Sequence, residues 1–240
     1  MSEKGTMIVG LTGQTGAGKS TLSKMFSGHN VFVIDADVVA RQVLEKSKGC
    51  LMDLVLEFST DVIHPDATLN REKLAEIVFS DKAKLKRLNE ITFPYIIDEI
   101  ERRIEKEKYK GTPIVVLDAP TLYESGLDKN CHRVVAVIAP MELRRDRIIQ
   151  RDQMTQQAAM RRINAQHDDE YYTSRADYIL TNGEDIDNFR FSFIDLMNKL
   201  QASYDDGSYK LPYRDASEID LDSQGRDKGE LAELEITEDP

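Results

Sequence analysis

The sequence predicts an α/β protein built around a five-stranded, parallel, doubly wound sheet. Short apolar runs of strand length recur along the chain, and segments with helical periodicity separate them. A glycine-rich loop follows the first run and precedes a helical pattern. Ligands of such sheets bind beyond the carboxyl ends of the strands. The predicted strands span residues 7–12, 31–34, 113–118, 133–138 and 177–180.

The glycine-rich loop, residues 13–20, matches the spacing G-x-x-x-x-G-K-[ST] at every fixed position. Its glycines let the backbone fold around a phosphate group, and amides at the start of the next helix would point toward the anion. Lys19 would reach the β- and γ-phosphates, and the Ser20 hydroxyl would coordinate Mg²⁺. The loop therefore predicts binding of a nucleoside triphosphate. The predicted contacts in this stretch are Gly16, Ala17, Gly18, Lys19, Ser20 and Thr21.

Three aspartates follow predicted strands at the edge of the sheet where ligands bind. Asp35 and Asp37 come directly after the second strand, and Asp118 ends the third. Transfer of a phosphoryl group needs a base near the acceptor hydroxyl and neutralisation of the phosphate charge. Asp37 is the predicted base, and it would also cap a helix that starts at Val38. Asp35 and Asp118 are both candidates to orient Mg²⁺, and the sequence does not separate them.

Residues 45–111 contain no strand-like run and follow helical periodicity, so we expect a helical insertion here. Asn70 is predicted to cap one of its helices. The insertion separates two strands of the sheet and is large enough to carry the site of a second substrate. The predicted core of the domain then comprises residues 6–44 and 112–205.

A helical lid is predicted over residues 140–168, between the fourth and fifth strands. Arg144, Arg147 and Arg151 are spaced i, i+3 and i+7, which places them on one helical face. A solvated helix surface is the alternative, but three such arginines in a triphosphate-binding protein favour a lid that closes over the phosphates. Arg144 is therefore a predicted nucleotide contact. Asn182 stands at an expected turn after the fifth strand, and its contact with the nucleotide is a second prediction.

Composition limits the class of partner and the compartment. The formal net charge of −11 argues against nucleic-acid binding. No segment approaches the roughly 18 apolar residues of a membrane span, and the first residues lack a signal sequence. Cys50 and Cys131 are far apart and outside any CxxC pair, so we expect reduced thiols in a soluble, cytoplasmic protein. Residues 206–240 are acidic and predicted to form a disordered tail.

The chain resembles the dephospho-CoA kinase family from about Ile8 to Leu200. The phosphate loop is shared by many kinases, whereas Val33-Ile34-Asp35-Ala36-Asp37 with Ala40-Arg41 is more specific. Further matching residues follow in order along the chain. They are Leu69-Asn70-Arg71, Leu74, Ile77-Val78-Phe79, Ile91-Thr92-Phe93-Pro94, Asp118-Ala119-Pro120-Thr121-Leu122-Tyr123-Glu124, Arg147, Arg151-Asp152, Arg162-Ile163, Gln166, Ala176-Asp177 and Asn182.

The resemblance implies a P-loop kinase fold and transfer of the γ-phosphate of ATP to the 3′-hydroxyl of dephospho-CoA, the last step of coenzyme A synthesis. It implies that Lys19 and Ser20 hold phosphate and Mg²⁺, and that Asp37 is the base toward the ribose hydroxyl. Arg147 would stabilise the transferring phosphoryl group. The helical insertion would be the CoA-binding domain.

Three residues depart from the family's usual pattern. Gln14 stands where the family usually has a second glycine, Phe93 where it has histidine, and Thr121 where it has leucine. Gln14 leaves the fixed positions of the phosphate loop intact. Phe93 and Thr121 are expected nearer the acceptor than the phosphate loop.

Two other functions agree with the phosphate loop. One is a different small-molecule kinase of the same fold, and the other is an ATP-dependent switch that signals through its insertion or its tail. A GTPase of the common type is disfavoured because the sequence has no N-K-x-D motif. We expect a monomer or a weak homo-oligomer.

Overall fold

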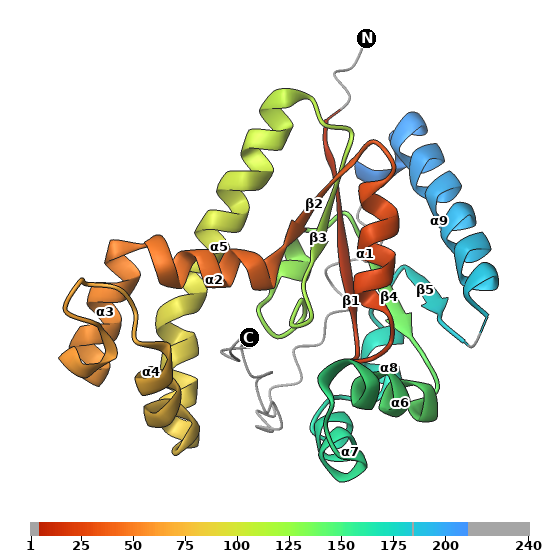
Figure 1. Cartoon of the computed structure of the whole chain (residues 1–240). Helices are drawn as coiled ribbons and strands as arrows, with labels where there is room; N and C mark the ends of the chain where they lie inside the picture. Colours follow the sequence, from red (N-terminus) through yellow and green to blue (C-terminus); the bar gives the residue numbers. More distant parts are fainter. Residues whose placement is uncertain (1–4, 184, 211–240) are drawn as a thin grey trace. The chain divides into compact units, whose positions relative to one another are not determined.

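The computed structural model describes residues 5–183 and 185–210 of the chain. These residues form two compact units, which are treated separately below. The first unit comprises residues 5–34 and 106–210, and it holds the sheet and the phosphate loop. The second comprises residues 35–105 and is helical. Figure 1 shows the course of the chain through both.

The sheet has the five strands that the sequence predicts. Its strands are β1 (Met7–Gly13), β2 (Val31–Asp35), β3 (Ile114–Asp118), β4 (Arg133–Ile138) and β5 (Tyr178–Thr181). The strand order is β2-β3-β1-β4-β5, and β1 pairs in parallel with both β3 and β4. This confirms the five-stranded, doubly wound sheet. The loop after β1 therefore starts at the central strand, between the loops that follow its two neighbours.

Strand β2 differs from its prediction as a buried strand. It lies at one edge of the sheet, so it has a neighbour on one side within the described residues. Ile34 is buried, but Phe32 is 40% exposed. The ammonium group of Lys110 lies 5.6 Å from the centre of the Phe32 ring, which is a cation–π contact at the surface. The continuous apolar run of β2 therefore belongs to a partly exposed edge strand and not to a fully buried one.

The helices of the first unit cover the sheet and form the predicted lid region. They are α1 (Lys19–Ser27), α6 (Met141–Asp152), α7 (Gln156–Asn164), α8 (Asp169–Thr173) and α9 (Ile186–Asp206), with short 3₁₀ turns at Leu127–Asn130 and Ser208–Lys210. Helix α1 packs on β1 and β3, and α9 packs on β5 (Figure 1). Their buried aromatic residues meet in the core, where the rings of Phe26 and Phe193 lie edge to face with centroids 5.2 Å apart.

The start of the predicted acidic tail is corrected by this core. The tail was predicted to begin at residue 206, but Tyr209 is 2% exposed and its ring stacks on Tyr204. Arg133 also donates a hydrogen bond of 3.0 Å to the carbonyl oxygen of Ser208. The folded domain therefore extends at least to Lys210. The rest of the predicted tail, residues 211–240, lies outside the described residues.

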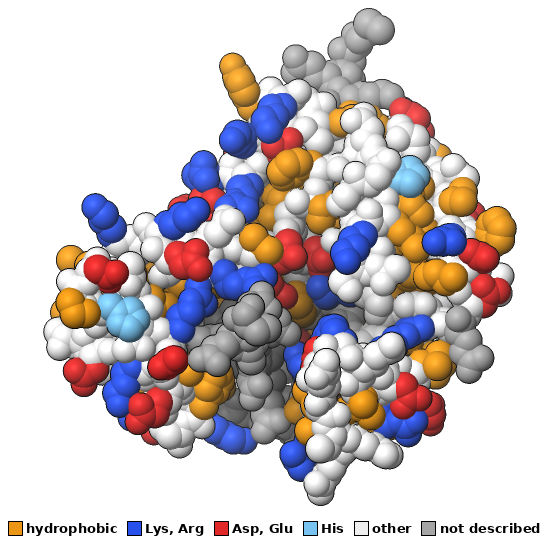
Figure 2. All heavy atoms as spheres, viewed as in Figure 1, with side chains coloured by type: hydrophobic (Ala, Val, Ile, Leu, Met, Phe, Trp, Pro, Cys, Tyr) orange, Lys and Arg blue, Asp and Glu red, His pale blue; other side chains and the backbone are white. Residues whose placement is uncertain are grey.

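The second unit is helical, as predicted for the insertion. It contains α2 (Ala36–Lys46), α3 (Lys48–Phe58), the 3₁₀ turn η1 (Thr60–Val62), α4 (Arg71–Phe79) and most of α5 (Lys82–Lys110). The unit begins ten residues before the predicted boundary at residue 45, because α2 belongs to it. The predicted cap of α4 is confirmed, since the Asn70 side chain accepts a hydrogen bond from the Lys73 amide. Acidic and basic side chains alternate over its surface in Figure 2.

The cap of α2 differs from the prediction. The helix starts at Ala36 and not at Val38, and its cap is Asp35. Asp35 Oδ1 accepts a hydrogen bond of 3.0 Å from the Val38 amide, while Asp37 lies in the first turn. The N-cap accepts from the amide two or three positions on, so the earlier start of the helix moves the capping role from Asp37 to Asp35.

The first prediction concerns this cap. Asp35→Ala removes the acceptor for the Val38 amide and is expected to lower the free energy of unfolding by about 1 kcal/mol. Asp35→Asn retains a capping oxygen and should keep the stability of the unchanged protein. Urea denaturation followed by circular dichroism measures both variants. An equal loss in the two would show that the carboxylate stabilises the fold in some way other than capping.

Candidate nucleotide-binding site

The glycines of the phosphate loop are required by the packing around it. Gly16 and Gly18 have φ angles of 76° and 102°, in the region that favours glycine. A Cβ atom on Gly16 would lie 2.7 Å from the carbonyl oxygen of Arg144 on α6. A Cβ atom on Gly18 would collide with the side-chain nitrogen Nδ2 of Asn182, just after β5. The loop therefore follows its path because two other segments occupy the space beside it.

The loop presents a set of backbone donors that suits phosphate. The amide of Thr15 donates to Gln166 Oε1 at 2.8 Å, and the amide of Ala17 donates to the Gln14 carbonyl at 3.1 Å. Helix α1 begins at Lys19, and the first amides of a helix have no intrahelical acceptor. The amides of Gly16, Gly18, Lys19 and Ser20 are thus the donors available to an anion. They lie at a helix N-terminus, where negative charge is favoured.

The lysine of the loop contacts the aspartate that ends β3. Lys19 Nζ donates to Asp118 Oδ1 in an ion pair, and the two side chains are 17% and 5% exposed. The register of β1 and β3 places Asp118 beside Leu11, two residues before the loop begins. Two residues predicted for the site from separate motifs, Lys19 and Asp118, therefore lie together.

Two other predicted site residues support the loop from behind. The Asn182 side chain is buried, and its Nδ2 donates to the Ala17 carbonyl at 2.8 Å. Arg147 Nη2 donates to the Gly183 carbonyl at 2.8 Å, and its Nη1 donates more weakly to the Gly16 carbonyl at 3.4 Å. Their predicted contacts with ATP stay predictions. In the structure both side chains hold the loop to the segment after β5.

Arg144 is a buried cation without a hydrogen-bond partner for most of its head group. It is 4% exposed, and its Nε and Nη1 have no partner among the described residues. Burial lowers the pKa of its guanidinium, while the nearby Asp169 and Tyr172 act in the opposite direction. An uncompensated buried charge destabilises a fold. The Arg144 backbone packs against Gly16, and the predicted contact of its guanidinium with the nucleotide stays a prediction.

Arg151, the third arginine of the predicted lid face, has a different environment. Its Nε donates to Asp152 Oδ1 at 2.6 Å, and its side chain is 54% exposed. Asp152 also accepts a hydrogen bond of 3.0 Å from Arg162 on α7. This network, together with the small apolar cluster of Ile148, Ala159 and Ile163, joins α6 to α7.

Comparison with known proteins agrees with this geometry. A sequence profile described as "Dephospho-CoA kinase" matches residues 7–188. The dephospho-CoA kinase of Lactobacillus johnsonii is 35% identical over 195 residues, which cover 81% of this chain and 98% of that protein. That of Arabidopsis thaliana is 36% identical over 186 residues, covering 78% of this chain and 80% of the plant protein.

The chain belongs to the dephospho-CoA kinase family. The solved structure of the dephospho-CoA kinase from Campylobacter jejuni superposes with a TM-score of 0.64 and 26% identity, covering 82% of this chain and 98% of that one. A Thermus thermophilus protein superposes with a TM-score of 0.68 and 27% identity, covering 82% of this chain and 99% of that one. The protein is therefore a kinase with ATP as its phosphoryl donor, and the P-loop kinase fold is confirmed.

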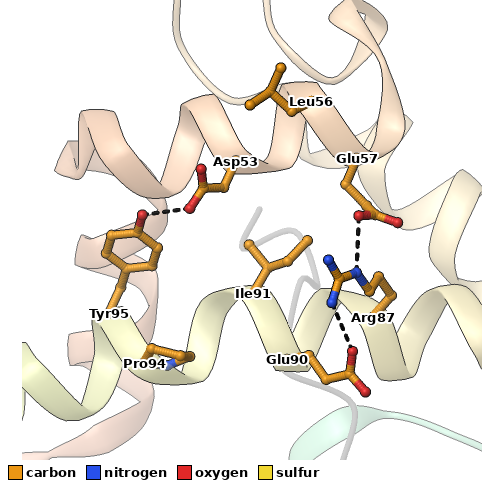
Figure 3. Close-up of a pocket in the computed structure, with 8 residues that line it drawn as sticks. All are labelled: Asp53, Leu56, Glu57, Arg87, Glu90, Ile91, Pro94 and Tyr95. Carbon is orange, nitrogen blue, oxygen red and sulfur yellow. Dashed lines mark hydrogen bonds and ion pairs between the residues drawn. The ribbon is translucent and has the colours of Figure 1, made fainter.

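The helical unit contains an open pocket of about 510 Å³ between α3 and α5. Figure 3 shows Tyr95 donating to Asp53 at 2.6 Å, and Arg87 donating to Glu57 at 2.9 Å and to Glu90 at 3.0 Å. The other lining residues are Leu56, Ile91 and Pro94. The charged residues that line the pocket are three carboxylates and one guanidinium, so the pocket carries an excess of negative charge.

The remaining predicted site residues lie in the same helical unit. Asp35 is exposed and Asp37 is half-buried, both at the start of α2. They belong to a different compact unit from Lys19, Ser20 and Asp118. Among the described residues, no three His, Cys, Asp or Glu side chains gather into a metal-binding group. Mg²⁺ in a phosphate-loop protein is held by phosphate oxygens, one hydroxyl and few carboxylates, and the residues around Ser20 fit that donor set.

Sequence reasoning missed a group of polar residues beside the loop. The Gln14 side chain donates to the His167 carbonyl at 2.8 Å, and the His167 ring stacks on Tyr171 with centroids 3.7 Å apart. Burial raises the pKa of the Glu124 carboxyl, which lies 3.8 Å from His167 Nε2. Gln166 matches the family in sequence, but a match does not show what the side chain contacts.

No helix among the described residues is long and apolar enough to cross a membrane.

The second prediction concerns Arg144. Arg144→Met removes a buried, poorly paired charge and is expected to raise the free energy of unfolding by about 1 kcal/mol. The same change should weaken ATP binding about tenfold, because a charge-assisted contact with phosphate is lost. Thermal denaturation and calorimetric ATP titration measure the two effects. Arg145→Met, on the same helix, is the matched control. A lower melting temperature with unchanged ATP binding would make Arg144 a packing residue alone.

Proposed function

We propose that the phosphate loop of this protein binds Mg²⁺–ATP and that its γ-phosphate passes to the 3′-hydroxyl of dephospho-CoA, giving coenzyme A. The observation that carries the proposal is the loop itself, in a chain that belongs to this family. Its glycine-dependent path, its available amides and the paired Lys19 and Asp118 match what a triphosphate needs. Gly16, Ala17, Gly18, Lys19, Ser20 and Thr21 would form the cradle.

Lys19 would exchange its partner when ATP binds. Its ammonium group now neutralises Asp118, and the β- and γ-phosphates offer a stronger cluster of negative charge. The exchange places the lysine at the oxygens where charge develops during transfer. The Asp118 carboxylate would then be available to a second cation, at the position that the Lys19 ammonium group leaves.

Ser20 would supply the hydroxyl ligand of Mg²⁺, and Asp118 would orient it. Mg²⁺ would neutralise charge on the β- and γ-phosphates when bound. Asp118 is favoured over Asp35 for this role because it already contacts Lys19, whereas Asp35 caps α2. Asp35 remains the other candidate to orient Mg²⁺, through the carboxylate oxygen that does not cap α2.

Asp37 is the proposed base toward the ribose hydroxyl. Because Asp35 provides the cap of α2, the orientation of Asp37 is not dictated by capping. Asp37 lies in the first turn of α2, where the helix dipole favours a negatively charged group. A base at this position would take the proton of the ribose hydroxyl during phosphoryl transfer.

Arg144 and Arg147 would act on the phosphates from the side of α6. Arg144 is buried and lacks a partner for Nε and Nη1, which suits direct contact with a phosphate oxygen. Arg147 would stabilise the transferring phosphoryl group, and its hydrogen bonds to the carbonyls of Gly16 and Gly183 add a role in holding the loop. Asn182 would act beside it at the nucleotide. The lid in this proposal is the α6–α7 region within residues 140–168.

The helical unit would carry the acceptor. The pocket between α3 and α5 is lined by three apolar residues and by three carboxylates against one guanidinium, so it suits the uncharged, amide-bearing arm of dephospho-CoA better than the diphosphate (Figure 3). Leu56 is 79% exposed at this pocket, and an apolar side chain in that position favours a ligand that covers it. We propose that residues 35–105 select the acceptor.

We also propose that the protein acts in the cytoplasm, as a monomer or weak homo-oligomer and without nucleic acid. The net charge of −11 disfavours contact with a polyanion. Cys50 and Cys131 are free cysteines, which suits a reducing compartment.

The third prediction tests the reaction. Incubation with Mg²⁺–ATP and dephospho-CoA should yield coenzyme A, detected by mass, and chelation of Mg²⁺ should abolish the product. ATP hydrolysis without a phosphorylated acceptor would favour an ATP-dependent switch. Phosphorylation of another small alcohol from an acceptor panel, in place of dephospho-CoA, would favour a different kinase of this fold.

The fourth prediction separates the two aspartates of α2. Asp37→Asn removes the base and is expected to lower kcat by roughly 10²- to 10⁴-fold. The KM values for both substrates and the melting temperature should change little. Asp35→Asn is the comparison variant: it keeps the cap of α2, and any loss of turnover should come through a changed Mg²⁺ dependence. Near-normal kcat in Asp37→Asn with loss of activity in Asp35→Asn would assign the base to Asp35.

A further inference from the structure

Two hydrogen bonds join the first turn of the phosphate loop to the segment after α7. Gln14 Nε2 donates to the His167 carbonyl at 2.8 Å, and the Thr15 amide donates to Gln166 Oε1 at 2.8 Å. Neighbouring residues on each segment are involved, and each segment supplies one side chain and one backbone group. Such a pair fixes both the distance and the orientation of the two segments.

Gln14 is buried more deeply than its amide chemistry favours. The residue is 4% exposed, and its Oε1 has no hydrogen-bond partner among the described residues. Burial of an amide with one polar atom unsatisfied lowers stability. A side chain retained under this cost, in a loop whose fixed positions do not require it, points to a role in the site.

The segment that Gln14 and Thr15 contact belongs to the α6–α7 region. Gln166 lies two residues after α7, and its backbone amide donates to the Ile163 carbonyl in the last turn of that helix. Ile163 packs with Ile148 of α6, and Arg147 of α6 donates to the Gly16 carbonyl. The region therefore holds the loop at two places, through α6 at Gly16 and through the end of α7 at residues 14–15.

The contact also decides which amides face the phosphates. The Thr15 amide is directed to Gln166, so the cradle of available donors starts at Gly16. Without that acceptor the Thr15 amide would be free to turn, and the path between Gly13 and Gly16 would be less restricted. A loop that is already shaped loses less conformational entropy when ATP binds.

We propose that Gln14 and Gln166 are positioning residues for ATP, which together clasp the first turn of the phosphate loop to the end of lid helix α7. The inference rests on the proposed function, because it assumes that ATP occupies this loop. The clasp keeps the loop in its nucleotide-binding shape before ATP arrives. It acts on the donor side of the reaction, so the acceptor should bind as before when it is broken.

The test removes each hydrogen bond while keeping side-chain volume. Gln14→Met removes the donor, Gln166→Met removes the acceptor, and the double variant removes both. Each single change should raise the Kd of Mg²⁺–ATP about fivefold, as expected for one neutral hydrogen bond. The double variant should raise it by more than the product of the two, because either bond alone still holds the segments together. Gln157→Met, at an exposed glutamine of α7, is the control and should bind ATP normally.

Steady-state kinetics distinguish positioning from a general loss of structure. The KM for ATP should rise with the Kd, while the KM for dephospho-CoA and the melting temperature stay close to those of the unchanged protein. ATP affinity within twofold of the unchanged protein in the double variant would overturn the proposal. So would a lower melting temperature with equal increases in both KM values.

The failure of this proposal can be told apart from failure of the proposed function. ATP binding is measured without acceptor, so it reports on the clasp even if no coenzyme A forms. If the wild-type protein makes coenzyme A and the variants bind ATP normally, the proposed role of Gln14 and Gln166 is wrong while the proposed function stands. If the double variant does not fold, the two single variants decide, since each retains one of the hydrogen bonds.

Discussion

The close approach of three segments to the phosphate loop is the constraint on which the rest of this structure depends. The carbonyl of Val137 on β4, the backbone of Arg144 on α6 and the side chain of Asn182 occupy the positions where Cβ atoms of Gly13, Gly16 and Gly18 would lie. Glycine is therefore needed for space as well as for its backbone angles. A loop held on these sides keeps its shape without a ligand, and its remaining amides face the position that a phosphate would take.

Electrostatics follow from the same packing. The chain carries a net charge of −11, yet the cations nearest the loop are buried or partly buried and spaced by the fold. Lys19 is neutralised by Asp118, while Arg144 has an incomplete set of partners. Under the proposed function, a triphosphate would supply the acceptors that Arg144 lacks, so the cost of burying this charge would be offset when ATP binds.

The elements that depend on local pattern could be predicted, and those that depend on tertiary neighbours could not. Apolar runs and the G-x-x-x-x-G-K-[ST] spacing were sufficient for five strands and the loop, because both are properties of short segments. The cap of α2 was assigned to Asp37 because two aspartates follow β2 and either can cap; the start at Ala36 decides for Asp35. Likewise, i, i+3, i+7 spacing predicted one arginine face but not that Arg144 is buried, that Arg147 bonds to carbonyls and that Arg151 pairs with Asp152.

Those arginine environments show how a short motif depends on distant parts of the chain. The residues that would touch phosphate lie within positions 13–20, but the groups that hold them there come from α6, the end of α7 and the turn after β5. All of these follow β4, more than a hundred residues after the loop. A motif of the same spacing in another fold would lack Gln166, Arg147 and Asn182 as partners, and its first turn would be less restricted. We therefore expect affinity for a triphosphate to depend on the segment from α6 to Asn182 as much as on the loop, since contacts that order the loop beforehand reduce the entropy that ATP binding must cost.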